Sequence, residues 1–249
     1  MKTNVIILCL LVGVSTTTLA QPLSYPVTRK VEQVDDYHGT TIADPYRWLE
    51  DDRSGETADW VKAQNKVTFG YLDQIPYRPQ LKKRIEQLLD YTKYGKLFHR
   101  GDGEMGQWYY FYKNDGLQNQ WVLYRQKGLT GGADGSAVLP EVVIDPNQLA
   151  ADGTTRLMSF DLSKDGRYAA YALSKAGSDW EEVFIMDLQT LKTLPGKLEW
   201  TKFPGVTWTS TGFYYSGFDK PKTGKELSAQ NKYSKINYHQ VGTSQQEDQ

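Results

Sequence analysis

Apolar side chains recur at helical spacing in the part of the chain that follows residue 20. Between Thr57 and Ile75 they fall near one helical face, with Thr57 as the predicted N-cap. Ile75-Pro76 should end this helix, and Pro79 should open a second one at its first position. The second helix carries apolar residues at i, i+4, i+7 and i+8, namely Leu81, Ile85, Leu88 and Leu89. Both helices therefore need a partner surface for an apolar stripe.

From about Tyr91 onward the pattern changes to short aromatic or β-branched runs separated by turn residues, which is typical of β-strands. Stretch 159–188 predicts a strand, a tight turn and two more strands. The polar stretch 219–234 should be an exposed loop, and the tail 242–249 is polar throughout. The other predicted strand segments are 107–112, 120–125, 142–145, 205–216 and a run starting at 236.

A related β-unit returns after 46 positions (166 to 212), with Gly212-Phe213-Tyr214-Tyr215 standing where Gly166-Arg167-Tyr168-Ala169 stood. A repeat of about 40–50 residues is the signature of a propeller blade. Three blades and the start of a fourth fit into 91–249, whereas propellers usually have about four to eight. We therefore expect a mainly β fold, an incomplete propeller after a helical arm at 21–90. Its ring would be completed by a longer protein or by another chain, because open sheet edges promote aggregation.

The composition of the chain says more about where the protein is located than about its chemistry. A net charge of −1 without a basic block argues against a nucleic-acid surface. Residues 1–20 combine Lys2, an apolar run at 5–14 and a small-residue ending, which predicts a secretory signal cleaved after Ala20. The run is too short to span about 30 Å of hydrocarbon, so we expect a periplasmic or secreted protein without a membrane anchor. Cys9 is the single cysteine and lies in the signal, which leaves no disulfide in the mature chain.

Candidate chemistry is sparse along the chain. The segment Asp44–Asp51, DPYRWLED, is either an aromatic ligand platform or a staple that packs the arm onto a neighbouring domain, and we favour the staple. The acidic run 50–52 lacks the spacing of a calcium loop and is interpreted as solvated surface. The chain's histidines, His38, His99 and His239, are far apart and form no metal motif, so neither metal nor cofactor is expected.

No nucleophile can be assigned from the sequence. A G-x-S-x-G elbow is absent from the 249 residues. Ser178, in Gly177-Ser178-Asp179-Trp180, is better explained as a turn residue of a hairpin. We therefore assign no catalytic residue in this chain.

Several motifs, in the same order and at similar spacing, resemble the prolyl oligopeptidase family over essentially all of 25–248. They are Tyr37-His38-Gly39, Asp44–Asp51, Ala63–Lys66, Gly116–Gln120, Ser178-Asp179-Trp180 and Tyr238–Thr243. The resemblance implies a serine endopeptidase in which a seven-bladed propeller covers an α/β-hydrolase domain. That propeller admits only short peptides, which are cut after proline. The helical arm belongs to the hydrolase domain in that family.

The resemblance also implies that the Ser-Asp-His domain lies beyond residue 249. The expected partners are then short proline-containing peptides and the C-terminal hydrolase domain, and the chain alone should be inactive. Phe203 aligns with a family phenylalanine that lines a distal substrate subsite, although it could simply pack in its blade. The alternative function is a non-catalytic propeller-like module that self-assembles or pairs with a partner chain. The DNA downstream of codon 249 separates these hypotheses, because only the first needs a G-x-S-x-G segment there.

Overall fold

The computed structural model describes residues 23–100, 107–129, 138–227 and 229–249. They fall into two compact units, divided in the sequence between Pro79 and Gln80, which are described separately below. The predicted signal at 1–20 lies outside the described residues. Among the described residues, no helix has the length and apolar character needed to cross a membrane.

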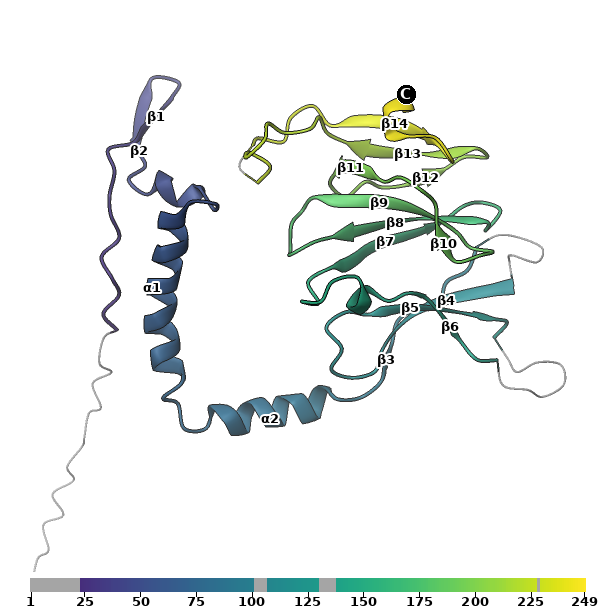
Figure 1. Ribbon diagram of the computed structural model, residues 1–249, viewed down its shortest axis with the longest axis horizontal. Coiled ribbons are helices and arrows are strands. Elements are labelled where there is room, and N and C mark those ends of the chain that lie inside the picture. Colours follow the sequence, from purple (N-terminus) through teal and green to yellow (C-terminus); the bar gives the residue numbers. More distant parts are fainter. Residues whose placement is uncertain (1–22, 101–106, 130–137, 228) are drawn as a thin grey trace, which may run out of the picture. The chain divides into compact units, whose positions relative to one another are not determined.

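The first unit begins with a small antiparallel hairpin and continues into a long helix. Strands β1 (Val34–Tyr37) and β2 (Thr40–Ala43) pair around the turn His38-Gly39. A short 3-10 helix (Arg47–Glu50) then leads into α1 (Gly55–Leu72) (Figure 1). The extended segment before β1 is tied to α1, because Trp60 Nε1 donates to Thr28 Oγ1 at 2.9 Å.

The prediction of Thr57 as the N-cap of α1 was wrong, because the helix begins three residues earlier. Ser54 is the N-cap, and its hydroxyl accepts a hydrogen bond from the Thr57 backbone N–H at 3.0 Å. Both residues are good caps three positions apart, so the pattern alone favoured the one nearer the apolar stripe. The helix also ends earlier than predicted, at Leu72 with Asp73 as its C-cap.

Helix α2 (Arg78–Leu89) places Pro79 at its second position, one residue later than predicted. Its apolar stripe lies largely in solvent in this chain. Leu81, Ile85, Leu88 and Leu89 are all classed as exposed. The described residues therefore provide no partner surface that buries this stripe.

The DPYRWLED segment packs within its own unit. Trp48 Nε1 donates to the Arg29 carbonyl at 2.9 Å, and the Arg29 guanidinium lies 5.0 Å from the Trp48 ring centroid. Arg47 bonds the carboxylates of Asp35 and Asp44, which raises the pKa of its guanidinium through those hydrogen bonds. These contacts join the 3-10 helix to the hairpin and to the segment before it, all within the first unit, so packing of this segment onto a neighbouring domain stays a prediction.

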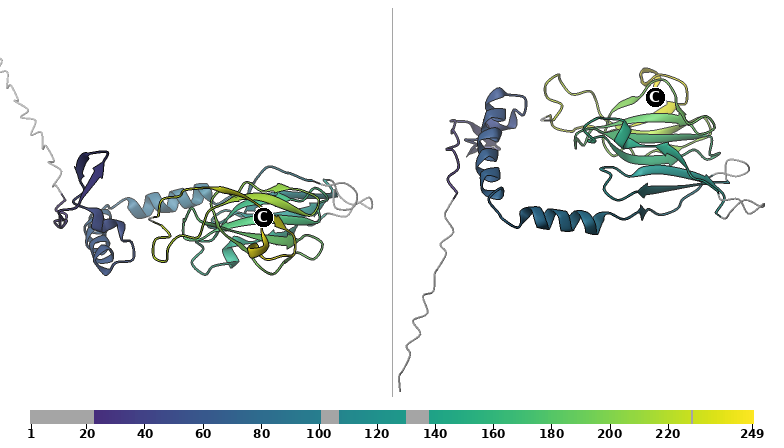
Figure 2. Two further views of the ribbon diagram at one scale, coloured as in Figure 1. Left: turned by 90° about the horizontal axis from the view of Figure 1, so that it is seen from above. Right: turned by 60° about the horizontal axis from the view of Figure 1, so that its bottom comes forward.

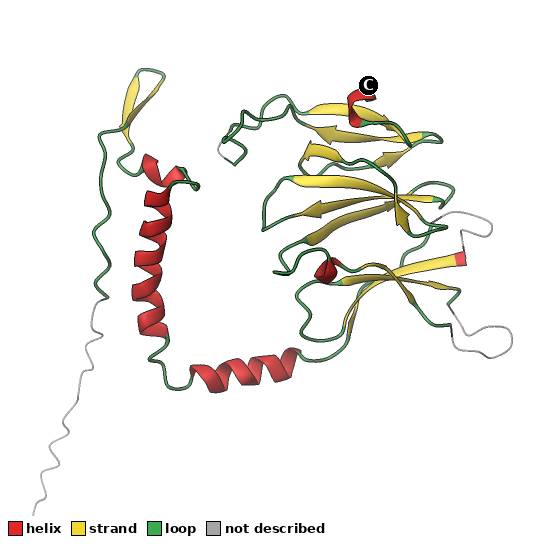
Figure 3. Ribbon diagram, in the orientation of Figure 1, coloured by secondary structure: helices red, strands yellow, loops and turns green. Residues whose placement is uncertain are grey.

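The second unit holds three antiparallel sheets, each formed from consecutive strands (Figure 1, Figure 3). The first sheet has the order β3 (Lys93–Tyr94), β4 (Trp108–Asn114), β5 (Val122–Lys127) and β6 (Glu141–Ile144). The second has β7 (Arg156–Leu162), β8 (Tyr168–Ser174), β9 (Glu181–Asp187) and β10 (Lys192–Thr193), while β11 (Leu198–Thr201) also pairs with β9. The third has β12 (Thr207–Trp208), β13 (Gly212–Gly217) and β14 (Lys235–Gln240). The described residues thus contain three of the expected three to four blades, and no strand pairing among them joins the first sheet to the third.

The 46-residue repeat corresponds to equivalent places in successive sheets. Gly166 precedes β8 and Gly212 begins β13, and both strands stand second in their sheets. Gly212 is required by close packing, since a Cβ there would lie 2.0 Å from the His239 carbonyl oxygen. The repeat in the sequence is therefore a repeat of blades.

Figure 2 shows two further views of the three sheets. Two layers of apolar side chains hold these sheets face to face. The first lies between the first and second sheets, where Tyr110 and Leu123 meet Phe160 and Leu188. The second lies between the second and third sheets and is filled from the third by Trp208, Phe213 and Tyr215. Small residues of β8, Ala170 and Ala172, allow that close approach. The first layer has aromatic side chains on both sides, Tyr110 and Phe160, whereas the second packs aromatic side chains of the third sheet on small and β-branched residues of the second.

One buried charge crosses the first layer. The Arg125 side chain, on β5, is only 5% exposed and donates to Glu141 at 2.8 Å. It also donates to the Leu188 carbonyl at the end of the second sheet, and its guanidinium stacks 4.1 Å from the Trp108 ring centroid. Arg125 therefore links two blades by hydrogen bonds as well as by packing.

Candidate functional site

Phe203 does not pack inside its blade. It lies between β11 and β12, and 68% of its surface is exposed. Its backbone has φ of 48°, a left-handed conformation that a bulky side chain rarely adopts. Such strain persists only where the surroundings enforce it, and it often marks a binding site.

The surroundings that hold Phe203 come from both neighbouring sheets. Its N–H donates to the Glu181 side chain at 3.4 Å, and its carbonyl accepts from Ser216 Oγ at 3.4 Å. Thr201, two residues earlier, donates its hydroxyl to the Glu181 carbonyl at 2.8 Å. Ser216 N–H bonds the Pro204 carbonyl at 2.7 Å on the other side. The loop is thus fixed to β9 and β13, with the phenyl ring directed away from the core.

Phe203 borders a pocket of about 370 Å³. The first strand of the second sheet forms one wall, and the loop leading to β12 forms the other. Its lining residues are Met158, Ser159, Asp161, Glu181, Phe203, Pro204, Gly205 and Val206. This is the size and mixture of apolar and polar lining that small ligand sites share.

Two carboxyl groups belong to this lining, and neither was singled out from the sequence. Burial raises the pKa of Glu181, with a further upward contribution from the charge of Asp179. Burial likewise raises the pKa of Asp161, opposed by a hydrogen bond from Ser159 and by the charge of Arg100. An alternating strand normally directs such residues to solvent, so nothing in the pattern distinguished them.

The other sequence candidates lie away from this pocket or have structural roles. Ser178 turns the β8–β9 hairpin, and its hydroxyl accepts from the Trp180 N–H at 3.0 Å, as predicted for a turn residue. His38 occupies the β1–β2 turn, and His99 lies 5.0 Å from the Tyr109 ring. The described residues contain no group of three or more His, Cys, Asp or Glu side chains that could hold a metal ion.

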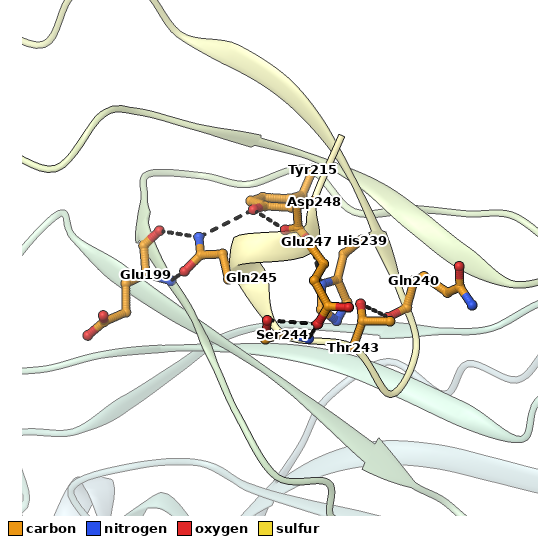
Figure 4. A network of polar contacts seen from close by, with 9 residues as sticks. All are labelled: Glu199, Tyr215, His239, Gln240, Thr243, Ser244, Gln245, Glu247 and Asp248. Atoms are coloured by element: carbon orange, nitrogen blue, oxygen red, sulfur yellow. Dashed lines mark hydrogen bonds and ion pairs between the residues drawn. The ribbon is translucent and has the colours of Figure 1, made fainter.

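His239 is part of a buried polar network rather than of the Phe203 pocket (Figure 4). Its Nδ1 lies 2.7 Å from Asp248 Oδ1, and Asp248 Oδ2 accepts from the Tyr215 hydroxyl at 2.7 Å. Burial and the bond to Asp248 raise the pKa of Tyr215. Gln245 extends the network to the backbone of Glu199 in the second sheet. The polar tail therefore folds back and joins the second and third sheets.

Comparisons with known proteins agree with this arrangement of sheets. Residues 25–249 match the sequence family described as prolyl oligopeptidase, N-terminal β-propeller domain. The prolyl endopeptidase of Elizabethkingia meningoseptica is 43% identical over 91% of this chain and 30% of its own length. Prolyl oligopeptidase A of Amanita bisporigera is 34% identical over 94% of this chain and 33% of its own length.

A solved structure shares the fold. Prolyl oligopeptidase B of Galerina marginata, bound to a 35mer hydrolysis and macrocyclization substrate, superposes with a TM-score of 0.73 at 31% identity, over 92% of this chain and 34% of that one. The chain thus spans about a third of the length of these relatives. The matched family and the three stacked antiparallel sheets place this chain in the family of prolyl oligopeptidase N-terminal β-propeller domains.

Proposed function

We propose that this chain is the propeller portion of a serine endopeptidase of prolyl oligopeptidase type, which cuts short peptides after proline. The propeller contributes a peptide-contacting surface and restricts the size of what enters, while the chemistry belongs to an α/β-hydrolase domain. The relatives named prolyl endopeptidase extend well past the matched third, which supports a further domain. The absence of a G-x-S-x-G segment from the 249 residues supports our proposal that the chain alone does not hydrolyse peptides.

The exposed apolar stripe of α2 supports the hydrolase domain as a partner. Four large aliphatic side chains on a 12-residue helix are exposed. Contiguous exposed apolar surface of this kind usually marks an interface. We propose that the helical arm packs against the hydrolase domain in the complete enzyme.

Export is the second part of the proposal. It is supported by the pattern of residues 1–20, with Lys2, an apolar run and a small-residue ending at Ala20. A protein of this kind would act on peptides in the periplasm or outside the cell.

The single observation that carries the peptide-binding role is the position of Phe203. Its ring is exposed at the border of a pocket, in a strained backbone conformation fixed by Glu181 and Ser216. A ring held in this way offers rigid apolar area to a peptide side chain at low entropic cost.

Substituting Phe203 should therefore weaken peptide binding without unfolding the sheets. We expect Phe203→Ala to reduce affinity for acetyl-norleucyl-alanyl-prolyl-alanine amide roughly five- to tenfold, the effect of losing about 1–1.4 kcal/mol of aromatic contact. Titrations with this peptide, followed in ¹H–¹⁵N correlation spectra, give the dissociation constants of the wild-type chain and of Phe203→Ala. Phe69→Ala is the matched control, since Phe69 is 49% exposed on α1 and does not line the pocket. Equal affinity of the wild type and Phe203→Ala would contradict the role of Phe203.

A further inference from the structure

The Phe203 pocket has acidic acceptors on one wall, contributed by a single face of the second sheet. Phe160 and Leu162 of β7 point into the layer shared with the first sheet, so Asp161 between them points to the opposite face. On β9, Val183 and Ile185 belong to the layer shared with the third sheet. Glu181 precedes Val183 by two positions and so lies on that same face. Both carboxyl groups therefore face the same pocket.

Glu181 is buried without a cationic partner. The residue is 2% exposed, and the hydrogen bond that its carboxylate accepts from the Phe203 N–H is long, at 3.4 Å between nitrogen and oxygen. No lysine or arginine forms an ion pair with Glu181 or Asp161 in the part of the chain that the structure describes. Buried carboxylates are usually paired, because an isolated charge in a low-dielectric site is costly. A carboxylate held in this way is poised to accept a cation that enters the pocket.

The charges around the two groups leave the pocket acidic. Asp179 adds negative charge near Glu181, and Arg100 acts on Asp161 from a distance without an ion pair. The remaining lining side chains are Met158, Ser159, Phe203, Pro204 and Val206, none of which carries charge. The Phe203 ring completes the wall, and aromatic faces attract ammonium and guanidinium groups.

We propose that this pocket binds a cationic group of the peptide, an ammonium or a guanidinium, with Glu181 and Asp161 as its acceptors and Phe203 as its aromatic wall. This inference rests on the proposed function, because it names a preferred class of peptide for the same site. A lysine or arginine side chain and a free peptide amino terminus share the required chemistry. Because Glu181 also accepts a hydrogen bond from the Phe203 N–H, a cation that binds Glu181 should change the NMR signal of the Phe203 amide.

The test compares three peptides that differ in one cation. They are acetyl-norleucyl-alanyl-prolyl-alanine amide, its lysine analogue with lysine in place of norleucine, and the norleucine peptide with a free amino terminus. We expect one of the two cationic peptides to bind the wild-type chain at least tenfold more tightly than the neutral one, as a charge-assisted hydrogen bond predicts. The tighter one identifies the source of the cation. The amide signal of Phe203 should shift most.

Glu181→Gln should reduce the ratio between the affinities for the cationic and the neutral peptide to about twofold or less. Its amide oxygen can still accept the Phe203 N–H, so the loop is preserved. Glu199→Gln is the matched control, because Glu199 is partly buried on the same sheet, pairs with Lys197 and lies outside the pocket. The cationic advantage should also decline as pH falls through the raised pKa values of Glu181 and Asp161, since the protonated groups no longer attract a cation.

Failure of this inference and failure of the proposed function give different results. Equal affinities of all three peptides would overturn the cation site and leave peptide binding intact. If the neutral peptide does not bind, n-butylammonium chloride is the second probe. A Glu181-dependent shift of the Phe203 amide would then support the cation site alone, and no shift would overturn it.

Discussion

Replacing Arg125 with alanine should lower the free energy of unfolding by about 3–4 kcal/mol, which combines a lost charged hydrogen bond with a lost desolvated cation–π contact. The side chain is 5% exposed and spans two sheets. Its loss leaves the Leu188 carbonyl without this donor and opens space beside Trp108. We expect urea denaturation to show both the lower stability and a less cooperative transition, because the first and second sheets are linked here.

Two further variants separate the contributions of charge and packing. Arg125→Met keeps most of the aliphatic volume and should recover part of the loss. Arg167→Ala removes an arginine whose side chain is 53% exposed and 3.7 Å from Asp187, so its cost should be below about 1 kcal/mol. Equal effects of Arg125→Ala and Arg167→Ala would show that the buried link does not stabilise the fold.

Replacing Asp248 with alanine should cost about 3 kcal/mol, since each of two buried partners left unpaired costs about 1–3 kcal/mol. The Asp248 side chain is 6% exposed and bonds both His239 and Tyr215. Because its two partners lie on β14 and β13, we expect the third sheet to lose protection first. Amide hydrogen exchange of β13 and β14 measures this directly.

The conservative variant tests whether hydrogen bonding or charge matters at this position. Asp248→Asn retains an acceptor oxygen and adds a donor amide, so it should cost only about 1 kcal/mol. Phe213 contacts His239 at 5.5 Å between ring centroids, and its packing should survive in this variant. Unchanged exchange in Asp248→Ala would contradict the account of the tail as a structural link.

The arrangement of strands was largely predictable, because aromatic and β-branched runs separated by turn residues specify short strands. The predicted run 107–112 became β4 (Trp108–Asn114), and the hairpin after Ser174 has its turn at Ser178. The 46-residue repeat predicted successive blades because each blade places the same strand at the same point. The start of α1 was less predictable, since Ser54 and Thr57 are both suitable caps and only the fold decides between them.

The tail and the pocket depended on contacts distant in sequence. The polar composition of 242–249 gave no sign that Asp248 is buried, because its partners come from other strands. The family resemblance singled out Phe203, yet its exposure follows from the loop that Glu181 and Ser216 hold. In the sequence, Glu181 looks like any polar residue of an alternating strand. Its burial follows from the pairing of β11 with β9, which the sequence pattern does not show.

The most direct test of the central claim joins this chain to the rest of a relative. The Elizabethkingia meningoseptica prolyl endopeptidase matches the chain over 30% of its length, and this chain can replace that matched part. We expect the joined protein to hydrolyse a proline-containing chromogenic peptide and a serine-directed phosphonate to stop it, while the 249-residue chain alone shows no turnover. Phosphonate-sensitive turnover by the chain alone, or a folded joined protein without turnover, would contradict the claim that this chain is the propeller portion of such a peptidase.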